Sequence, residues 1–118
     1  MLLRYYGGCM RKYKHNFRLE IFHPYSEPYD PLNDDVVVHV YLNDKVYHGW
    51  FFTPLRIQAI METGKISGEC INGTYFWSTD FLIIAEISQH NCEKVVDDLL
   101  EREFFYEVFS DITEGILE

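Results

Sequence analysis

Residues 68–87 read GECINGTYFWSTDFLIIAEI, and the segments on either side of this stretch are most simply interpreted as its partners. Asn72-Gly73 predicts a tight turn, because glycine tolerates a positive φ and asparagine adopts the left-handed conformation more easily than most residues. An aromatic run at 75–77, a polar break at 78–80 and an apolar run at 81–85 follow the turn. Consecutive apolar residues over the length of a strand are typical of a strand covered on both faces. We therefore predict a central β-hairpin in this stretch.

Three further strands are predicted before the central stretch. Apolar residues alternate with others over 17–23, which indicates a strand with one face in the core. Residues 36–42 and 46–52 are rich in β-branched and aromatic residues and flank Asn43-Asp44, so they should form an antiparallel hairpin. The preferred register places the following side chains on the core face: Val36, Val38, Val40, Leu42, Val46, Trp50 and Phe52. A slip of one residue reverses this assignment, and a three-residue turn at 43–45 leaves the register open.

Helices are predicted on either side of the central stretch. Thr53 is a suitable N-cap, Pro54 suits the first helical position, and Gly64 is the expected C-terminal stop. Ser88 caps a second helix, whose apolar face has regular helical spacing: Cys92, Val95, Val96, Leu99 and Leu100. A short third helix is expected between 105 and 112. This order of elements predicts an α+β fold with a mainly antiparallel sheet of about five strands and two or three helices on one face.

The length and composition are those of one globular domain. The chain has 118 residues, of which 47% are hydrophobic, and this is enough to fill a core. Residues 17–118 are expected to form a single α+β domain. Residues 1–16 form a basic N-terminal segment, which we expect to be poorly ordered.

Charge is unevenly distributed along the chain. Residues 1–18 carry five basic groups and no acidic group, whereas residues 86–118 carry two basic and ten acidic groups, within a formal net charge of −9. Binding to nucleic acid requires basic side chains that neutralise phosphates, so this charge argues against nucleic acid and favours a basic protein as partner. Three cysteines without metal-ligand spacing are typical of a reducing cytosol, and no apolar run has the length of a membrane helix. We expect a cytoplasmic protein that makes no membrane contact.

Candidate catalytic and metal-binding residues have simpler structural explanations. Cys70 lies near the predicted tight turn, where its thiol could be exposed and act as a nucleophile with His39 or His48 as base, but free cysteines are usually buried and no third group orients a base. His39 and His48 could be neighbours across the 36–52 hairpin, although cross-strand polar pairs are common and no histidine pair has metal-ligand spacing. We expect no catalytic residue, no cofactor and no metal.

The acidic face of the second helix is the strongest candidate for a functional site. Its carboxylates are Glu93, Asp97, Asp98 and Glu101, and the acidic character continues into Glu103, Glu107 and Asp111. A solvated helix face explains them as well as a surface that steers a basic partner does. Aromatic anchors for such a partner are expected in the proline-containing loop at 23–35, which carries Tyr25 and Tyr29, and at Trp77. The four carboxylates of the helix and these three aromatic residues form the predicted partner-binding set.

Residues 47–87 also contain a series of short motifs that is familiar from other proteins. They contain a Gly-Trp-Phe-Phe-Thr strand before a helix, then Thr-Gly, Gly-Glu-Cys-Ile-Asn-Gly, Tyr-Phe-Trp and an apolar strand. This pattern resembles a family of small, largely uncharacterised bacterial α+β proteins with an acidic C-terminal helix, of the size and charge of toxin-neutralising immunity proteins. The resemblance covers about the last two thirds of the chain and implies no catalytic residue.

The leading hypothesis is a non-enzymatic acidic binding protein, specifically an immunity protein that occludes the active site of a basic, nuclease-type bacterial toxin. One alternative is a small enzyme or ligand-binding domain with a pocket near Cys70, Trp77 and His48. Another is a homodimeric structural protein, so both a monomer and a homodimer remain open.

Overall fold

The computed structural model describes residues 2–6, 9–24 and 28–117. Its strands are β1 (Leu2–Tyr6), β2 (Cys9–Tyr13), β3 (Arg18–Phe22), β4 (Asp35–Leu42), β5 (Lys45–Phe52), β6 (Phe81–Ile83) and β7 (Ser110–Asp111). Its helices are α1 (Pro54–Ser67), α2 (Glu69–Gly73), α3 (Gln89–Glu101), α4 (Phe105–Val108) and α5 (Thr113–Leu117).

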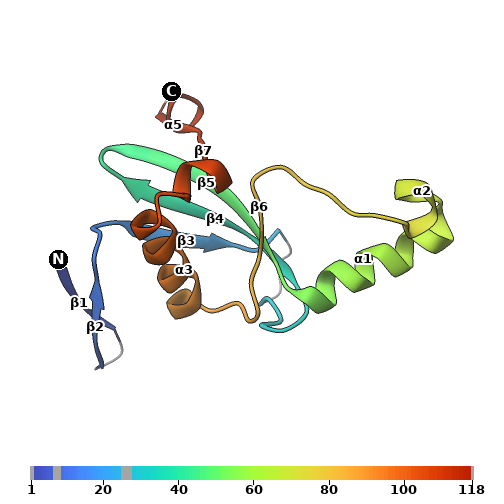
Figure 1. Ribbon diagram of the computed structural model, residues 1–118, viewed down its shortest axis with the longest axis horizontal. Coiled ribbons are helices and arrows are strands. Elements are labelled where there is room, and N and C mark those ends of the chain that lie inside the picture. The colour runs from blue at the N-terminus through green and yellow to red at the C-terminus, as the bar shows by residue number, and fades with distance from the viewer. Residues whose placement is uncertain (1, 7–8, 25–27, 118) are drawn as a thin grey trace.

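The main sheet has five strands in the order β3-β4-β5-β6, with β7 also paired to β5 (Figure 1). All pairings within it are antiparallel except that between β5 and β6, which is parallel. The helices α3 and α4 lie on one face of this sheet, and their buried side chains join those of the strands in one core. The predicted α+β class with a mainly antiparallel sheet is confirmed.

The register of β4 against β5 is set by a two-residue turn. Asn43 and Asp44 both have a positive φ, 51° and 63°, and the pairing therefore begins with Leu42 opposite Lys45. Tyr47, Gly49 and Phe51 then share the core face with alternate residues of β4. The predicted core face of β4 is confirmed, whereas that of 46–52 is wrong by one residue, and His48 and Trp50 lie on the opposite face.

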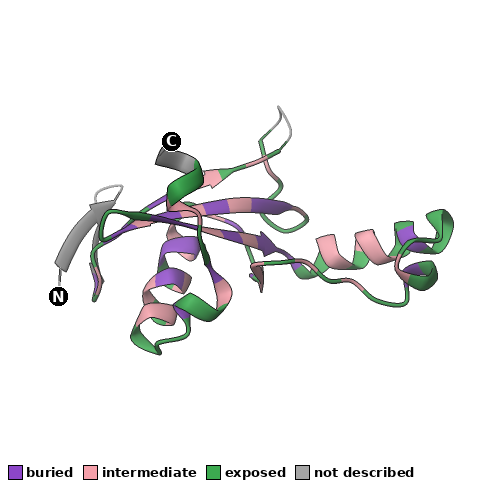
Figure 2. Ribbon diagram, turned by 90° about the horizontal axis from the view of Figure 1, so that it is seen from above, coloured by how far each residue is buried: buried purple, intermediate pink, exposed green. Residues whose placement is uncertain are grey.

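Gly49 allows the C-terminal part of the chain to pack closely on β5. Phe105 and Phe109 are buried, and their rings stack with centroids 4.5 Å apart over the core face. A Cβ atom on Gly49 would lie 2.5 Å from Cε2 of Phe109. The helix α3 contributes Cys92 and Val96 of its predicted apolar face to the same core, and its buried residues are purple in Figure 2.

The central hairpin predicted for 68–87 is not formed. Cys70, Ile71 and Asn72 all have φ between 50° and 55°, so Asn72-Gly73 belongs to a left-handed turn in α2. The apolar run 81–85 then contributes only the short β6, in which Ile83 is exposed. Left-handed backbone costs about 1–2 kcal/mol per non-glycine residue, so contacts elsewhere must offset the strain of this turn.

The helix α1 begins as predicted and ends later. Thr53 Oγ1 accepts a hydrogen bond from the backbone N–H of Arg56, and Pro54 is the first helical residue. The helix continues past Gly64 to Ser67 and ends at Gly68, which has a φ of 86°. Gly64 is instead buried against the backbone of Gly73, where an added Cβ would come within 3.0 Å of the Gly73 Cα.

Residues 54–80 form an arm that projects from the sheet. It consists of α1, α2 and a returning segment that leads to β6 (Figures 1 and 2). The radius of gyration of the chain is 15.7 Å, whereas a compact chain of this length has about 13.5 Å. Little of the arm therefore packs on the core.

The basic N-terminal segment contains regular structure. The strands β1 and β2 pair as an antiparallel hairpin, with Leu2 opposite Tyr13 and Tyr6 opposite Cys9. Tyr13, at the end of β2, is buried, and Phe17 belongs to the core. The order of residues 1–16 in solution stays a prediction.

We predict that Gly49→Ala lowers the free energy of unfolding by about 1–3 kcal/mol, because the new methyl group overpacks against the Phe109 ring. Urea denaturation of the two proteins measures this difference. Gly115→Ala is the control, since a Cβ at Gly115 has no neighbour within 4 Å. Equal stability of Gly49→Ala and the parent chain would contradict this account of the core.

Candidate partner-binding surface

The four acidic residues predicted on α3 have different environments. Glu93 is only 1% exposed, and its carboxylate accepts hydrogen bonds from the Tyr13 hydroxyl and the Gln89 side chain. Glu93 therefore stabilises the fold and does not contribute to the surface. Asp98 is exposed and pairs with Arg102 of the next turn, at a distance of 3.1 Å.

Asp97 and Glu101 hold the segment that follows β2. Oδ1 of Asp97 accepts hydrogen bonds from the backbone N–H groups of Lys14 and His15, at 2.9 and 3.0 Å. The Lys14 ammonium lies 3.1 Å from the Glu101 carboxylate. Part of the predicted acidic face is thus neutralised by the chain itself, because the basic segment packs beside it.

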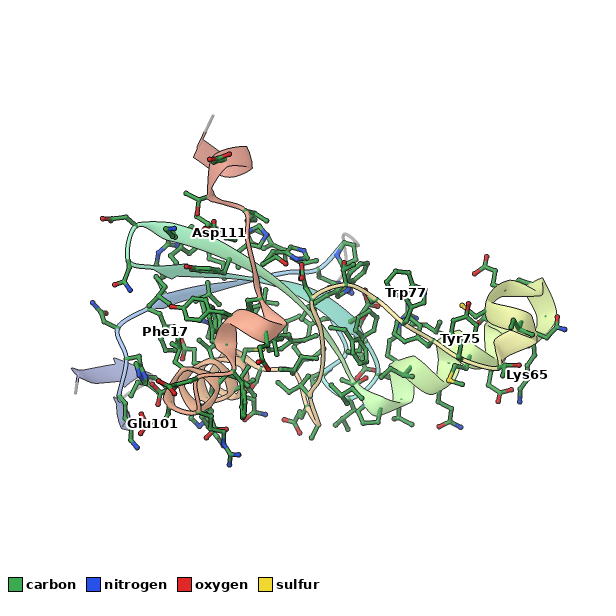
Figure 3. All side chains as sticks on the ribbon, turned by 45° about the horizontal axis from the view of Figure 1, so that its top comes forward. Phe17, Lys65, Tyr75, Trp77, Glu101 and Asp111 are labelled. Atoms are coloured by element: carbon green, nitrogen blue, oxygen red, sulfur yellow. The ribbon has the colours of Figure 1, made fainter. Side chains whose placement is uncertain are left out.

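The predicted aromatic anchors do not lie beside these carboxylates. Tyr25 is outside the described residues. Tyr29 is half-buried, and its ring packs edge-on against His23 with centroids 6.3 Å apart. Trp77 is exposed on the arm, whereas Glu101 lies at the other end of the molecule (Figure 3). The predicted set therefore does not form one continuous surface.

A run of exposed acidic and aromatic residues lies instead where α3 meets α4. We name it the α3–α4 corner, and its exposed residues are Asp98, Glu101, Glu103, Phe104, Tyr106 and Glu107. Among the described residues, Glu103 and Glu107 make no ion pair. The sequence prediction included Glu103 and Glu107 but did not consider Phe104 and Tyr106, although aromatic residues between two glutamates were a visible signal.

The backbone of the corner is strained at Glu103. Arg102 is the C-cap of α3, and the N–H groups of Glu103 and Phe104 donate to the carbonyls of Leu100 and Leu99, which is the Schellman arrangement. The residue of this motif that adopts the left-handed conformation is usually glycine. Here it is Glu103, which has a φ of 64°. A residue in an unfavourable backbone conformation lowers the stability of the fold. Such residues are therefore concentrated at functional sites, where the conformation serves a purpose.

A second polar cluster lies on the face of the sheet opposite α3. His39 and His48 are direct partners across β4 and β5, as the sequence suggested, and their ring centroids are 5.7 Å apart. His48 Nδ1 lies 2.9 Å from the Asp80 carboxylate, which also accepts a hydrogen bond from Ser110. The carboxylate lies between the serine and the histidine, so the order of groups differs from that of a Ser-His-Asp triad, in which the histidine contacts the serine.

The described part of the chain brings together no group of three or more potential metal ligands among histidine, cysteine, aspartate and glutamate. Cys70 lies in α2 at the outer end of the arm, whereas His48 lies on β5, so the two residues do not approach each other (Figure 1). Cys92 is fully buried, and burial raises the pKa of its thiol to about 12.

No helix in the described ranges combines the length and the apolar character that crossing a membrane requires. Comparison of the chain with protein-family models, curated proteins and solved structures finds no match. The function of the chain is therefore inferred from its own geometry.

We predict that Cys70 and Cys92 differ sharply in thiol reactivity. In Cys9→Ser protein at pH 8, Cys70 should react with a chromogenic disulfide at the slow rate of an ordinary thiol, because no histidine activates it. Cys92 should react only after unfolding, because its thiol is buried and protonated. Cys70→Ser identifies the reacting residue, and an unusually fast reaction at Cys70 would favour the enzyme alternative.

We predict that His39 makes the stability of the fold depend on pH. Burial, and secondly the nearby His48, lower the pKa of His39 in the folded state, and Glu20 opposes this shift only in part. As pH falls, the unfolded chain therefore binds the proton first, at a pKa of about 6.5. The free energy of unfolding should decrease below that pH and level off below the folded pKa. Urea denaturation between pH 8 and pH 5 should show a smaller decrease for His39→Gln, and equal slopes would contradict the assignment.

Proposed function

We propose that this chain is a non-enzymatic acidic binding protein that neutralises a basic protein, specifically a cytoplasmic immunity protein against a nuclease-type bacterial toxin. The observation that carries the proposal is the α3–α4 corner. There, exposed carboxylates precede and follow two exposed aromatic residues along the chain, and a glutamate occupies a backbone position that favours glycine.

The charge of the corner supports a basic partner. Residues 98–107 contain four carboxylates and one arginine, which leaves a net charge of −3 over ten residues. Such a patch steers a basic protein and raises its association rate, whereas exposed charges alone add little affinity. Phe104 and Tyr106 supply the apolar contact area, since interface hot spots are enriched in aromatic residues and are surrounded by a polar rim.

The proposed mechanism is occlusion. A nuclease active site binds phosphates with basic side chains, and carboxylates can take the places of those phosphates. Glu103 and Glu107 are suited to this role because neither is neutralised by a cation among the described residues. Asp97 and Glu101 contribute less, because Lys14 and His15 already contact them.

The experiment compares what tagged variants of this chain retain from lysate of the native host. The parent chain should retain one basic protein at low salt and release it at high salt, because exposed charge pairs are screened. Glu103→Lys/Glu107→Lys should retain at least ten times less of it. The matched control is Glu62→Lys/Glu69→Lys, which makes the same change in charge on the arm.

The retained protein must also lose activity when bound. The parent chain should inhibit its nuclease activity at a one-to-one ratio, and the corner variant should not. Equal retention by the corner variant, or retention of a protein that stays fully active, would contradict the proposal.

Glu103→Gly separates stability from binding. Relief of the left-handed strain contributes about 1–2 kcal/mol, and the greater freedom of glycine in the unfolded chain offsets about 0.5–1 kcal/mol of this. We expect urea denaturation to show an unfolding free energy higher by up to about 1 kcal/mol. Binding of the retained protein should weaken at the same time, and unchanged binding would show that Glu103 has no role in it.

A further inference from the structure

The arm, residues 54–80, exposes an unusual amount of apolar surface. Ile66 is 91% exposed, Ile71 is 70% exposed and Trp77 is 67% exposed, and Leu55 and Tyr75 are also exposed. Apolar residues occur all around α1 and not on one face. A helix of this kind is normally covered on more than one side, whereas among the described residues of the arm α1 is accompanied by α2 at its outer end and by the returning segment (Figure 1).

The arm differs from the rest of the chain in charge. Apart from Asp80 at its base, whose carboxylate lies beside His48, the arm contains two basic and two acidic groups, so residues 54–79 have a net charge of zero, whereas the whole chain carries −9. Lys65 pairs with Glu62 at 2.9 Å, and Arg56 pairs with Asp35 at 2.8 Å. The arm therefore gives a basic protein no electrostatic complement, and it is the part of this acidic chain on which two copies can meet without repulsion.

The end of the arm is strained as well as exposed. Ile71 is β-branched and has a φ of 50°, and its side chain lies largely in solvent. Few residues of this type adopt the left-handed conformation. The turn is held in place by the close contact between Gly64 and Gly73. This contact does not cover the side chain of Ile71.

We propose that the arm is a homodimerisation element that packs on the arm of a second copy. The two arms lie side by side in opposite directions, so that the acidic bodies are at opposite ends and repel each other least. Covering the five exposed apolar side chains would remove on the order of 500 Å² per copy from water, or about 1,000 Å² in total, which is the lower limit for a specific interface. The dimer should therefore be a weak one, with a dissociation constant in the micromolar range.

Sedimentation equilibrium of the full chain over a range of concentrations tests the proposal. The parent chain should approach twice its mass of 14.1 kDa at high micromolar concentration. Leu55→Glu and Ile66→Glu should each weaken the association at least tenfold. Leu32→Glu is the matched control, because Leu32 lies outside the arm and is 53% exposed, against 52% for Leu55.

Sedimentation equilibrium at different salt concentrations distinguishes dimerisation through the arm from binding of a basic protein at the α3–α4 corner. Apolar association should persist or strengthen at high salt, and Glu103→Lys/Glu107→Lys should leave it unchanged. Circular dichroism of each variant shows that it is folded. A parent chain that stays monomeric, or a Leu32→Glu chain that dissociates as much as Leu55→Glu, would overturn the proposal.

Discussion

The turn at Asn43 and Asp44 is the constraint on which the rest of the structure depends. Both residues are in the left-handed conformation, so the turn has two residues and Leu42 pairs with Lys45. Side chains alternate between the faces of a strand, and one register therefore decides every later position of β5. It places Gly49 under Phe109, which lets the C-terminal rings cover the core, and it places His48 on the opposite face.

Local signals were sufficient to predict the elements whose partners are near in sequence. The caps at Thr53 and Ser88, the apolar face of α3 and the 36–52 hairpin are all present, because each depends on hydrogen bonds or spacing within a few residues. The prediction failed for 68–87, where Asn72-Gly73 fits a hairpin turn and a left-handed helical turn equally well. What decides between them is the contact of Gly73 with Gly64, which no local pattern reveals.

The sequence predicted the chemical character of the candidate site but not its location. The sequence located the acidic part of the chain, but helical spacing cannot show that Glu93 is buried under Tyr13 or that Asp97 is bound by the backbone at 14–15. These contacts join residues about 80 positions apart. At the α3–α4 corner the sequence predicted the carboxylates and a short helix after Arg102, but helical spacing cannot show that Glu103 adopts the left-handed conformation or that Phe104 is exposed.

The base of the arm shows how the two proposed surfaces remain separate. Asp35 is almost fully buried, and it accepts hydrogen bonds from the Trp50 indole at 2.9 Å and from Arg56 of α1 at 2.8 Å. Together with the cap at Thr53, these bonds fix the direction in which α1 leaves the sheet, because a buried carboxylate that lost either partner would be costly. The arm therefore projects from the end of the molecule opposite Glu101 (Figure 3). The proposed apolar contact and the proposed acidic contact therefore use surfaces at opposite ends of the chain and respond differently to salt, so one need not displace the other.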